Sequence, residues 1–89
     1  MTICQTLAEQ FPDLAPIFVE RERLGMQRYG VPLDVCDGRE WISESREELA
    51  DAAVYLMAAF MREDCTARRE KIADAAARTV EALRAIQAI

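Results

Sequence analysis

The sequence predicts an all-α protein in which a short N-terminal helix precedes a long antiparallel helical hairpin. Three observations lead to this fold class. Glycine and proline number only three each among 89 residues, so the chain has few helix breakers. Apolar residues make up 52% of it and charged residues 30%, a balance that suits amphipathic helices. Apolar residues also recur at steps of three and four in the C-terminal half, which is the period of one helix face.

The length of the chain bears on its assembly. A chain of 89 residues has the size of one domain, here residues 1–89. A domain this small buries only about 60–65% of the surface that its unfolded chain exposes, which leaves little apolar core. We therefore expect a homo-oligomer, in which a second copy of the chain completes the helical bundle.

The first predicted helix covers residues 2–11. Thr6 and Glu9 have the spacing of a capping box within this segment. Pro12 prevents the helix from continuing, because proline lacks the backbone N–H that the next turn needs.

A second helix is expected from Pro16 to Gly30. Proline suits the first turn of a helix, and Asp13 lies close enough to cap it. Gly30 is a natural end, since glycine readily adopts the left-handed conformation that terminates many helices.

The loop and the hairpin come next. Residues 30–38, GVPLDVCDG, combine glycine, proline and aspartate as connecting loops do. We expect Asp37 to cap the next helix, with Glu40 completing a capping box. This helix meets no breaker before about Asp64, and the last helix runs from about Thr66 to the C-terminus. Its apolar seam comprises Ile72, Ala76, Val80, Leu83 and Ile86.

Five carboxylates fall within an arc of about 100° on the long helix: Glu40, Glu44, Glu47, Glu48 and Asp51. The opposite arc is expected to face the core: Ile42, Leu49, Ala53, Leu56, Met57 and Phe60. Glu44, Glu48 and Asp51, at i, i+4 and i+7, offer oxygen ligands that suit Mg²⁺. Alternatively, the acids form a solvated face near the positive end of the helix. Arg39 and Arg46 would then pair with them.

Charge and cysteine content exclude several classes of partner. The net charge of −5 argues against polymeric nucleic acid and anionic membranes, which bind clustered lysine and arginine. The longest apolar run, AAVYLMAAFM, has ten residues, against the roughly 20 that span a bilayer. The three cysteines lie far apart and the chain has no histidine, which excludes a Cys/His zinc motif. Their odd number and the lack of a signal peptide favour reduced thiols in the cytoplasm.

Four arginines around the loop have the chemistry to bind phosphate, because the guanidinium fork matches phosphate oxygens: Arg21, Arg23, Arg28 and Arg39. Ordinary surface charges are the alternative for each of them. Tyr29 and Trp41, on either side of the loop, are candidates either for stacking against a nucleotide base or for sealing the core.

The stretch ESREELADAAVYL resembles the metal-binding helix of the MazG-type all-α nucleoside triphosphate pyrophosphohydrolases. The E-x-x-D element of that family is matched by Glu48-Leu49-Ala50-Asp51. The longer pattern RYGVPLDVCDGREW....EELADAAVYL, from Arg28 to Leu56, is also similar to small phage and prophage proteins grouped with that family. The resemblance covers about a third of the chain.

The resemblance implies an all-α dimer or tetramer that holds Mg²⁺, or Mn²⁺, and hydrolyses a nucleoside triphosphate to the monophosphate and pyrophosphate. It implies metal ligation by Glu48 and Asp51, with Glu44 as a further ligand. Glu47 is expected to act as a ligand or as the catalytic base. We expect the phosphates of the substrate to bind the arginines considered above, Arg28 and Arg39.

Members of this family carry an E-E-x-x-E element on a separate helix, and no such element precedes Gly30 here. Hairpin register offers Glu81 as a fourth acid, or as the salt-bridge neighbour of Arg78 or Arg84. A second copy of the chain is another source of acids. The alternative function is a non-catalytic, phage-encoded helical module that serves oligomerisation or protein binding.

Overall fold

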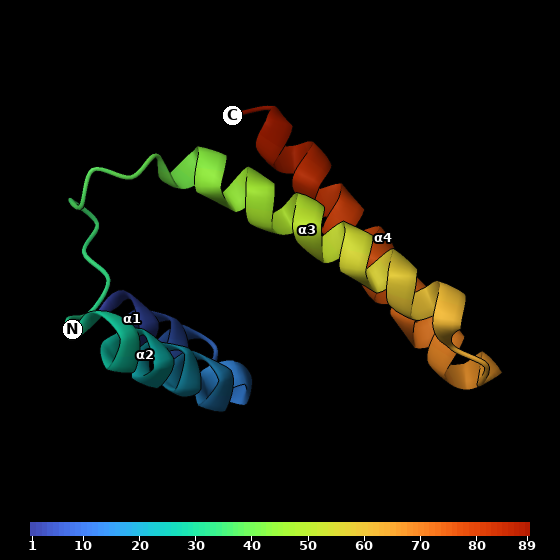
Figure 1. Cartoon of the computed structure of the whole chain (residues 1–89), viewed down its shortest axis with the longest axis horizontal. Helices are drawn as coiled ribbons and strands as arrows, with labels where there is room; N and C mark the ends of the chain where they lie inside the picture. The colour runs from blue at the N-terminus through green and yellow to red at the C-terminus, as the bar shows by residue number, and fades with distance from the viewer. The chain divides into compact units, whose positions relative to one another are not determined.

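The computed structural model describes residues 1–89 and confirms the all-α class, with 79% of residues in helices and no strand. Its elements in chain order are α1 (Ile3–Gln10), the 3₁₀ turn η1 (Pro12–Leu14), α2 (Ala15–Tyr29), α3 (Trp41–Arg62) and α4 (Thr66–Gln87) (Figure 1). Two helices therefore precede the hairpin, at the two segments where helices were expected, whereas the predicted fold class named only one short helix there. The contacts divide the chain into two compact units, Met1–Arg39 and Glu40–Ile89, which we call unit 1 and unit 2.

Helix α1 of unit 1 begins one turn earlier than the predicted capping box. The Oγ1 atom of Thr2 accepts a hydrogen bond from the N–H of Gln5 at 3.0 Å, and Oε1 of Gln5 accepts one from the N–H of Thr2 at 2.8 Å. The predicted pair, Thr6 and Glu9, is therefore wrong. Thr6 already lies inside the helix, where its hydroxyl donates to the carbonyl oxygen of Thr2 at 3.0 Å.

Helix α2 starts and ends close to its predicted limits. Pro16 lies in its first turn, where no intrahelical N–H is needed. Asp13 does not cap it, because Asp13 belongs to η1 and Leu14 occupies the cap position without a side-chain hydrogen bond. The predicted end is confirmed: Gly30 has φ 77°, and its N–H donates to the carbonyl oxygen of Met26 at 2.8 Å.

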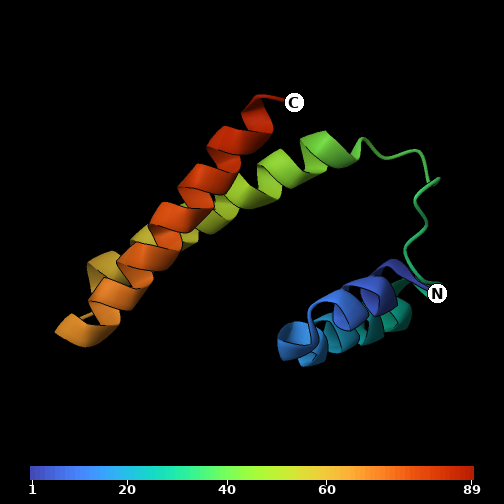
Figure 2. The same ribbon diagram turned by 180° about the vertical axis from the view of Figure 1, so that it is seen from behind.

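Unit 2 is the predicted hairpin of two 22-residue helices, which lie side by side in both ribbon views (Figures 1 and 2). Glu63 organises the turn between them. Its carboxylate pairs with Nε of Arg68 at 3.1 Å and accepts the N–H of Cys65 at 3.2 Å. Its carbonyl accepts a hydrogen bond from Arg69 at 3.0 Å, and the Arg69 guanidinium lies 4.1 Å from the ring centre of Phe60.

The predicted cap of α3 is wrong. The helix begins at Trp41, and Glu40 occupies the cap position without a side-chain hydrogen bond. Asp37 instead accepts the N–H of Arg39 at 3.0 Å and pairs with Nε of Arg39 at 3.1 Å. Gly38, with φ 90°, turns the chain between them, so Asp37 closes a local turn before the helix starts.

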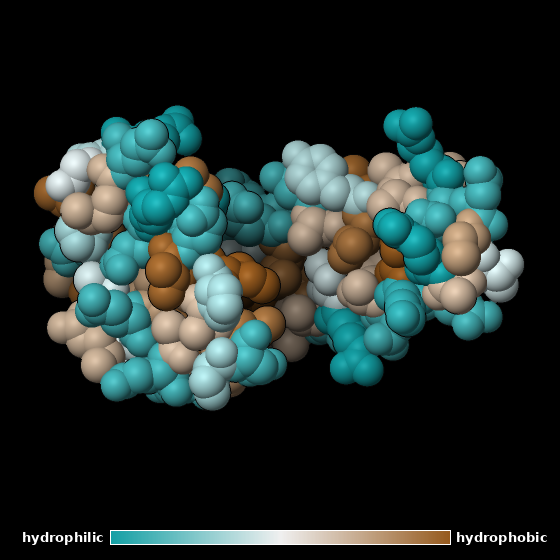
Figure 3. All heavy atoms as spheres, turned by 90° about the horizontal axis from the view of Figure 1, so that it is seen from below, coloured by the Kyte–Doolittle hydropathy of each residue, from teal (hydrophilic) through white to brown (hydrophobic).

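The seam between α3 and α4 is half-buried, and no residue of either unit is fully buried. Its half-buried members on α3 are Ile42, Leu49, Ala53, Leu56 and Phe60, and on α4 they are Ile72, Ala76, Leu83 and Ile86. Met57 and Val80, which were expected in the core, are 51% and 40% exposed. Apolar atoms accordingly reach the surface among polar ones (Figure 3).

One flank of the hairpin is apolar. On α3, Ala50, Val54, Met57 and Met61 follow each other at steps of four, three and four residues, so they share one side of the helix. Val54 is 64% and Met61 73% exposed. On α4 the corresponding residues are Ala73, Ala77 and Val80. When each helix is viewed from its own N-terminus, both rows lie clockwise from the seam. Because the two helices are antiparallel, the rows therefore lie on the same flank of the hairpin. We call this surface the apolar flank.

Candidate functional site

The acidic face of α3, defined as Glu44, Glu47, Glu48 and Asp51, consists of exposed residues. The half-buried residues Ile42, Leu49 and Ala53 mark the side of α3 that is turned to α4. At 100° per residue the acidic face lies opposite to that side. None of its carboxylates takes part in an ion pair, since the five pairs of the chain involve other acids: Glu20, Asp37, Glu63, Asp74 and Glu81.

The arginines expected to neutralise the acidic face do not do so. Arg39 pairs with Asp37 instead. Arg46 is half-buried on α3, and its Nε atom has no hydrogen-bond partner. The acidic face therefore carries like charges at i, i+3 and i+4 without compensation, an arrangement that destabilises a helix by a few tenths of a kcal/mol per pair.

Glu81 does not join the acidic face. Its carboxylate pairs with Nη1 of Arg84, and it lies on the side of α4 away from the half-buried seam residues Ile72 and Leu83. Of the two interpretations left open for Glu81, the structure shows the salt bridge with Arg84. No group of three cysteine, aspartate or glutamate side chains in the chain converges on one point.

The acidic face still has the donor set of a hard cation. All its ligands are carboxylate oxygens, which Mg²⁺ prefers, and Mg²⁺ usually keeps several waters and takes phosphate oxygens in its other positions. Ligation of a cation by Glu44, Glu48 and Asp51 stays a prediction. A closed cage made by one chain is not present.

A hollow of about 740 Å³ in unit 1 is the second candidate site. Its walls come from the start of α1, the second half of α2 and the loop that follows α2. This volume lies within the range of small-molecule pockets, roughly 300–1,000 Å³. Three of the four candidate arginines line it, Arg21, Arg28 and Arg39. Arg23 does not, and it pairs with Glu20 at 2.6 Å.

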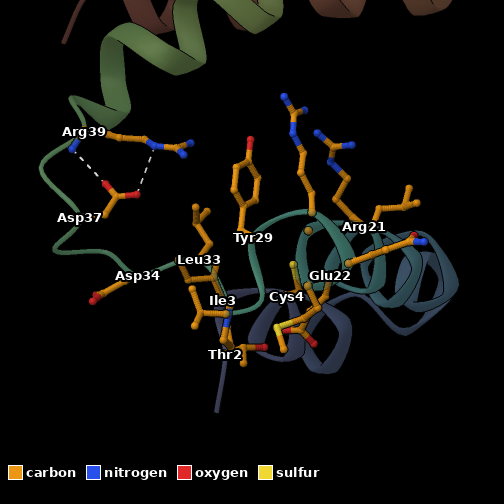
Figure 4. A pocket seen from close by; sticks show the side chains of 17 residues that line it. Thr2, Ile3, Cys4, Arg21, Glu22, Tyr29, Leu33, Asp34, Asp37 and Arg39 are labelled. Atoms are coloured by element: carbon orange, nitrogen blue, oxygen red, sulfur yellow. Dashed lines mark hydrogen bonds and ion pairs between the residues drawn. The ribbon is translucent and has the colours of Figure 1, made fainter.

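An aromatic ring also lines this hollow. Tyr29 is 60% exposed, so it does not seal a core. The guanidinium carbon of Arg28 lies 5.2 Å from its ring centre, within the range of a cation–π contact. In Figure 4 Arg39 extends from the loop on the same side of the hollow as Tyr29. Trp41, the other aromatic candidate, belongs to unit 2 and is half-buried at the start of α3.

Among the residues of this hollow that were not anticipated from the sequence are Thr2, Ile3 and Cys4. They belong to the first turn of α1, which packs against α2. The spacing of Thr2 and Gln5, a cap and a glutamine three residues later, was the available signal for the start of this helix. Nothing in the sequence pattern indicated that this turn would meet the end of α2.

No family model, no curated protein and no solved structure matches the chain. Nor does any of its helices combine the length and the hydropathy needed to cross a membrane.

Proposed function

We propose that the protein is a Mg²⁺-dependent nucleoside triphosphate pyrophosphohydrolase. The observation that carries this proposal is the acidic face of α3, whose four carboxylates are exposed and unpaired although the chain has arginines that pair with other acids. If this face were only a solvated surface without a ligand, ion pairs with arginine would stabilise it. Uncompensated carboxylates at this spacing are consistent with a cation as their partner.

Glu44, Glu48 and Asp51 are the proposed ligands of Mg²⁺ or Mn²⁺. The cation would neutralise charge on the phosphates and lower the pKa of a bound water. Glu47, on the same face, is the proposed base that accepts the proton of the attacking water. Attack of water on the α-phosphorus would break the bond to the oxygen that bridges the α- and β-phosphates, and pyrophosphate would leave with that oxygen while the monophosphate remains. Phosphate binding by Arg28 and Arg39, which belong to unit 1, is a separate part of the proposal.

Release of pyrophosphate tests this proposal directly. The full-length protein is incubated with the ribo- and deoxyribonucleoside triphosphates in Mg²⁺ or Mn²⁺, and pyrophosphate is measured. We expect Glu48→Gln to lower the rate at least about a hundredfold, since it removes a ligand that acts on the reacting phosphates. Glu81→Gln is the matched control, because this acid lies on α4 and should leave the rate unchanged. If no nucleotide yields pyrophosphate, the proposal is wrong.

The alternative function is a non-catalytic helical module that serves oligomerisation or protein binding. The observation that favours it is the apolar flank of the hairpin, whose large side chains Val54, Met57 and Met61 are 51–73% exposed, in a unit without a fully buried residue. Covering each of them would contribute on the order of 1 kcal/mol. A homo-oligomer, dimer or tetramer, would cover this flank in either function, so the pyrophosphate measurement distinguishes the two.

A further inference from the structure

The hollow of unit 1 contains two arginines without a carboxylate partner. Arg39 is held by Asp37, with Nε of Arg39 3.1 Å from the carboxylate. Arg21 and Arg28 form no ion pair with any acid of the chain. They are seven residues apart on α2, so they lie on the same side of the helix, about 10 Å apart along its axis. Their guanidinium groups are available to an anion.

Two of the three carboxylates that line the hollow lie on another side of it, and the third, Asp37, pairs with Arg39. Figure 4 shows the side chains of Arg21, Tyr29 and Arg39 along one side, with Asp34 and Glu22 on the other. Asp34 is engaged with its own loop, because its Oδ1 atom accepts the N–H of Cys36 at 2.9 Å. Arg21 and Arg28 are therefore the arginines of the hollow without an ion pair, and the guanidinium carbon of Arg28 lies 5.2 Å from the ring centre of Tyr29.

Gly25 lies between the two arginines, four residues after Arg21 and three before Arg28, and it lines the same hollow. A glycine inside a helix lowers helix stability relative to alanine. No packing reason accounts for it here, since a Cβ atom at this position would meet nothing within 4 Å. The missing side chain leaves room on the helix surface between the two guanidinium groups.

We propose that this hollow binds a small molecule that joins phosphate groups to an aromatic ring, a nucleoside phosphate being the simplest example. Arg21 and Arg28 bind the phosphates, Tyr29 stacks on the ring, and Gly25 leaves the space through which the phosphates approach α2. Apolar wall residues, including Leu24 and Leu33, cover the rest of the ligand. This inference rests on the proposed function only in taking a nucleoside phosphate as the example of the ligand. The binding itself needs no metal.

Calorimetric titration of the full-length protein with ATP, GTP, CTP and UTP in EDTA tests the inference. We expect at least one of them to bind, and Arg21→Gln and Arg28→Gln each to weaken that binding about tenfold or more. Arg23→Gln is the matched control, because Arg23 lies on the same helix, pairs with Glu20 and does not line the hollow. Equal losses in all three variants would show a general effect of charge and would overturn the inference.

Two further variants separate the parts of the site. Tyr29→Ala should weaken binding of the nucleotide but not of inorganic triphosphate, because only the nucleotide has a ring to stack. Gly25→Leu should weaken both by filling the space between the arginines, whereas Gly25→Ala should raise the melting temperature by improving helix propensity.

The outcomes also separate this inference from the proposed hydrolysis. Absence of binding by all four nucleotides in EDTA overturns the inference, whatever the metal-dependent activity shows. Nucleotide binding that depends on Arg21 and Arg28, without any pyrophosphate release in Mg²⁺, supports the inference and refutes the hydrolysis.

Discussion

Helices α3 and α4 have the same length, 22 residues each, but they arrange their charges in different ways. On α4 two of the three acids have an arginine three or four residues later: Asp74 pairs with Arg78 at 2.9 Å, and Glu81 pairs with Arg84. The third, Glu70, forms no ion pair. On α3 the four acids of the acidic face stand together without an arginine at those spacings on their C-terminal side. The outer surface of α4 thus has ion pairs between acids and arginines, whereas the four acids of α3 form no ion pair.

The two helices also differ on the apolar flank. The row on α4 consists of two alanines and Val80, whereas the row on α3 includes Val54, Met57 and Met61. Large apolar side chains at helical spacing are typical of a surface that packs against another helix. Helix α3 therefore has two surfaces that are unusual for a helix facing water, one acidic and one apolar. On α4 the corresponding surfaces have fewer unpaired acids and smaller apolar side chains.

The largest expected effect is on self-association. We expect Met57→Glu to abolish homo-oligomer formation, since it would place a charge at the centre of the apolar flank, and the helical content should remain. Ala59→Glu is the control, because Ala59 is exposed on the opposite flank of α3. Light scattering over a range of concentrations measures the mass. A monomeric wild-type protein at every concentration, or an oligomer that survives Met57→Glu but not Ala59→Glu, would contradict this prediction.

A smaller effect, of opposite sign on the two helices, tests the difference in charge. Without metal, Glu48→Gln should raise the free energy of unfolding by about 0.2–0.5 kcal/mol, because it relieves repulsion from Glu44 and Asp51. Glu81→Gln should lower it by a similar amount, because it removes the pair with Arg84 and no other acid lies three or four residues away. Urea denaturation followed by circular dichroism measures both. The same sign for the two variants would show that the acidic face is no different from the outer face of α4.

The smallest effect concerns the Glu20–Arg23 pair of α2, which repeats the arrangement of α4. The hydrogen bond from Arg23 holds the pKa of Glu20 below its ordinary value of 4.5. Desolvation opposes this shift, and the charge of Arg23 adds a smaller contribution that lowers the pKa. Because the pKa is lowered, the pair stabilises the fold at pH values above the ordinary value of 4.5. This stabilisation is lost as the pH falls through the lowered pKa of Glu20. Arg23→Gln should return the pKa of Glu20 toward its ordinary value, as measured by NMR titration. An unchanged value would show that the pair does not form in solution.

Local patterns in the sequence were sufficient for much of the fold. The helical period, the positions of Pro12 and Pro16, and Gly30 with its left-handed backbone determined which segments are helical and where α2 ends. These features act within a few residues, so reading them requires no knowledge of the rest of the chain. The spacing of the acids likewise placed them on one side of α3, since that side depends only on helix geometry.

Other features depended on which partner each group finds in space. Asp37 had the right spacing for a cap, but its carboxylate instead contacts the backbone N–H and the guanidinium of Arg39 across the turn at Gly38. Met57 and Val80 fell within the apolar stripes of their helices, yet a two-helix seam covers only a narrow arc, and both remained exposed. Arg21, Arg28 and Tyr29 of α2 line one hollow together with the first turn of α1 and the loop after α2. Helix period and chain breakers are local and were determined by the sequence alone, whereas pairing, exposure and the hollow arise from contacts between segments and were decided by the tertiary structure.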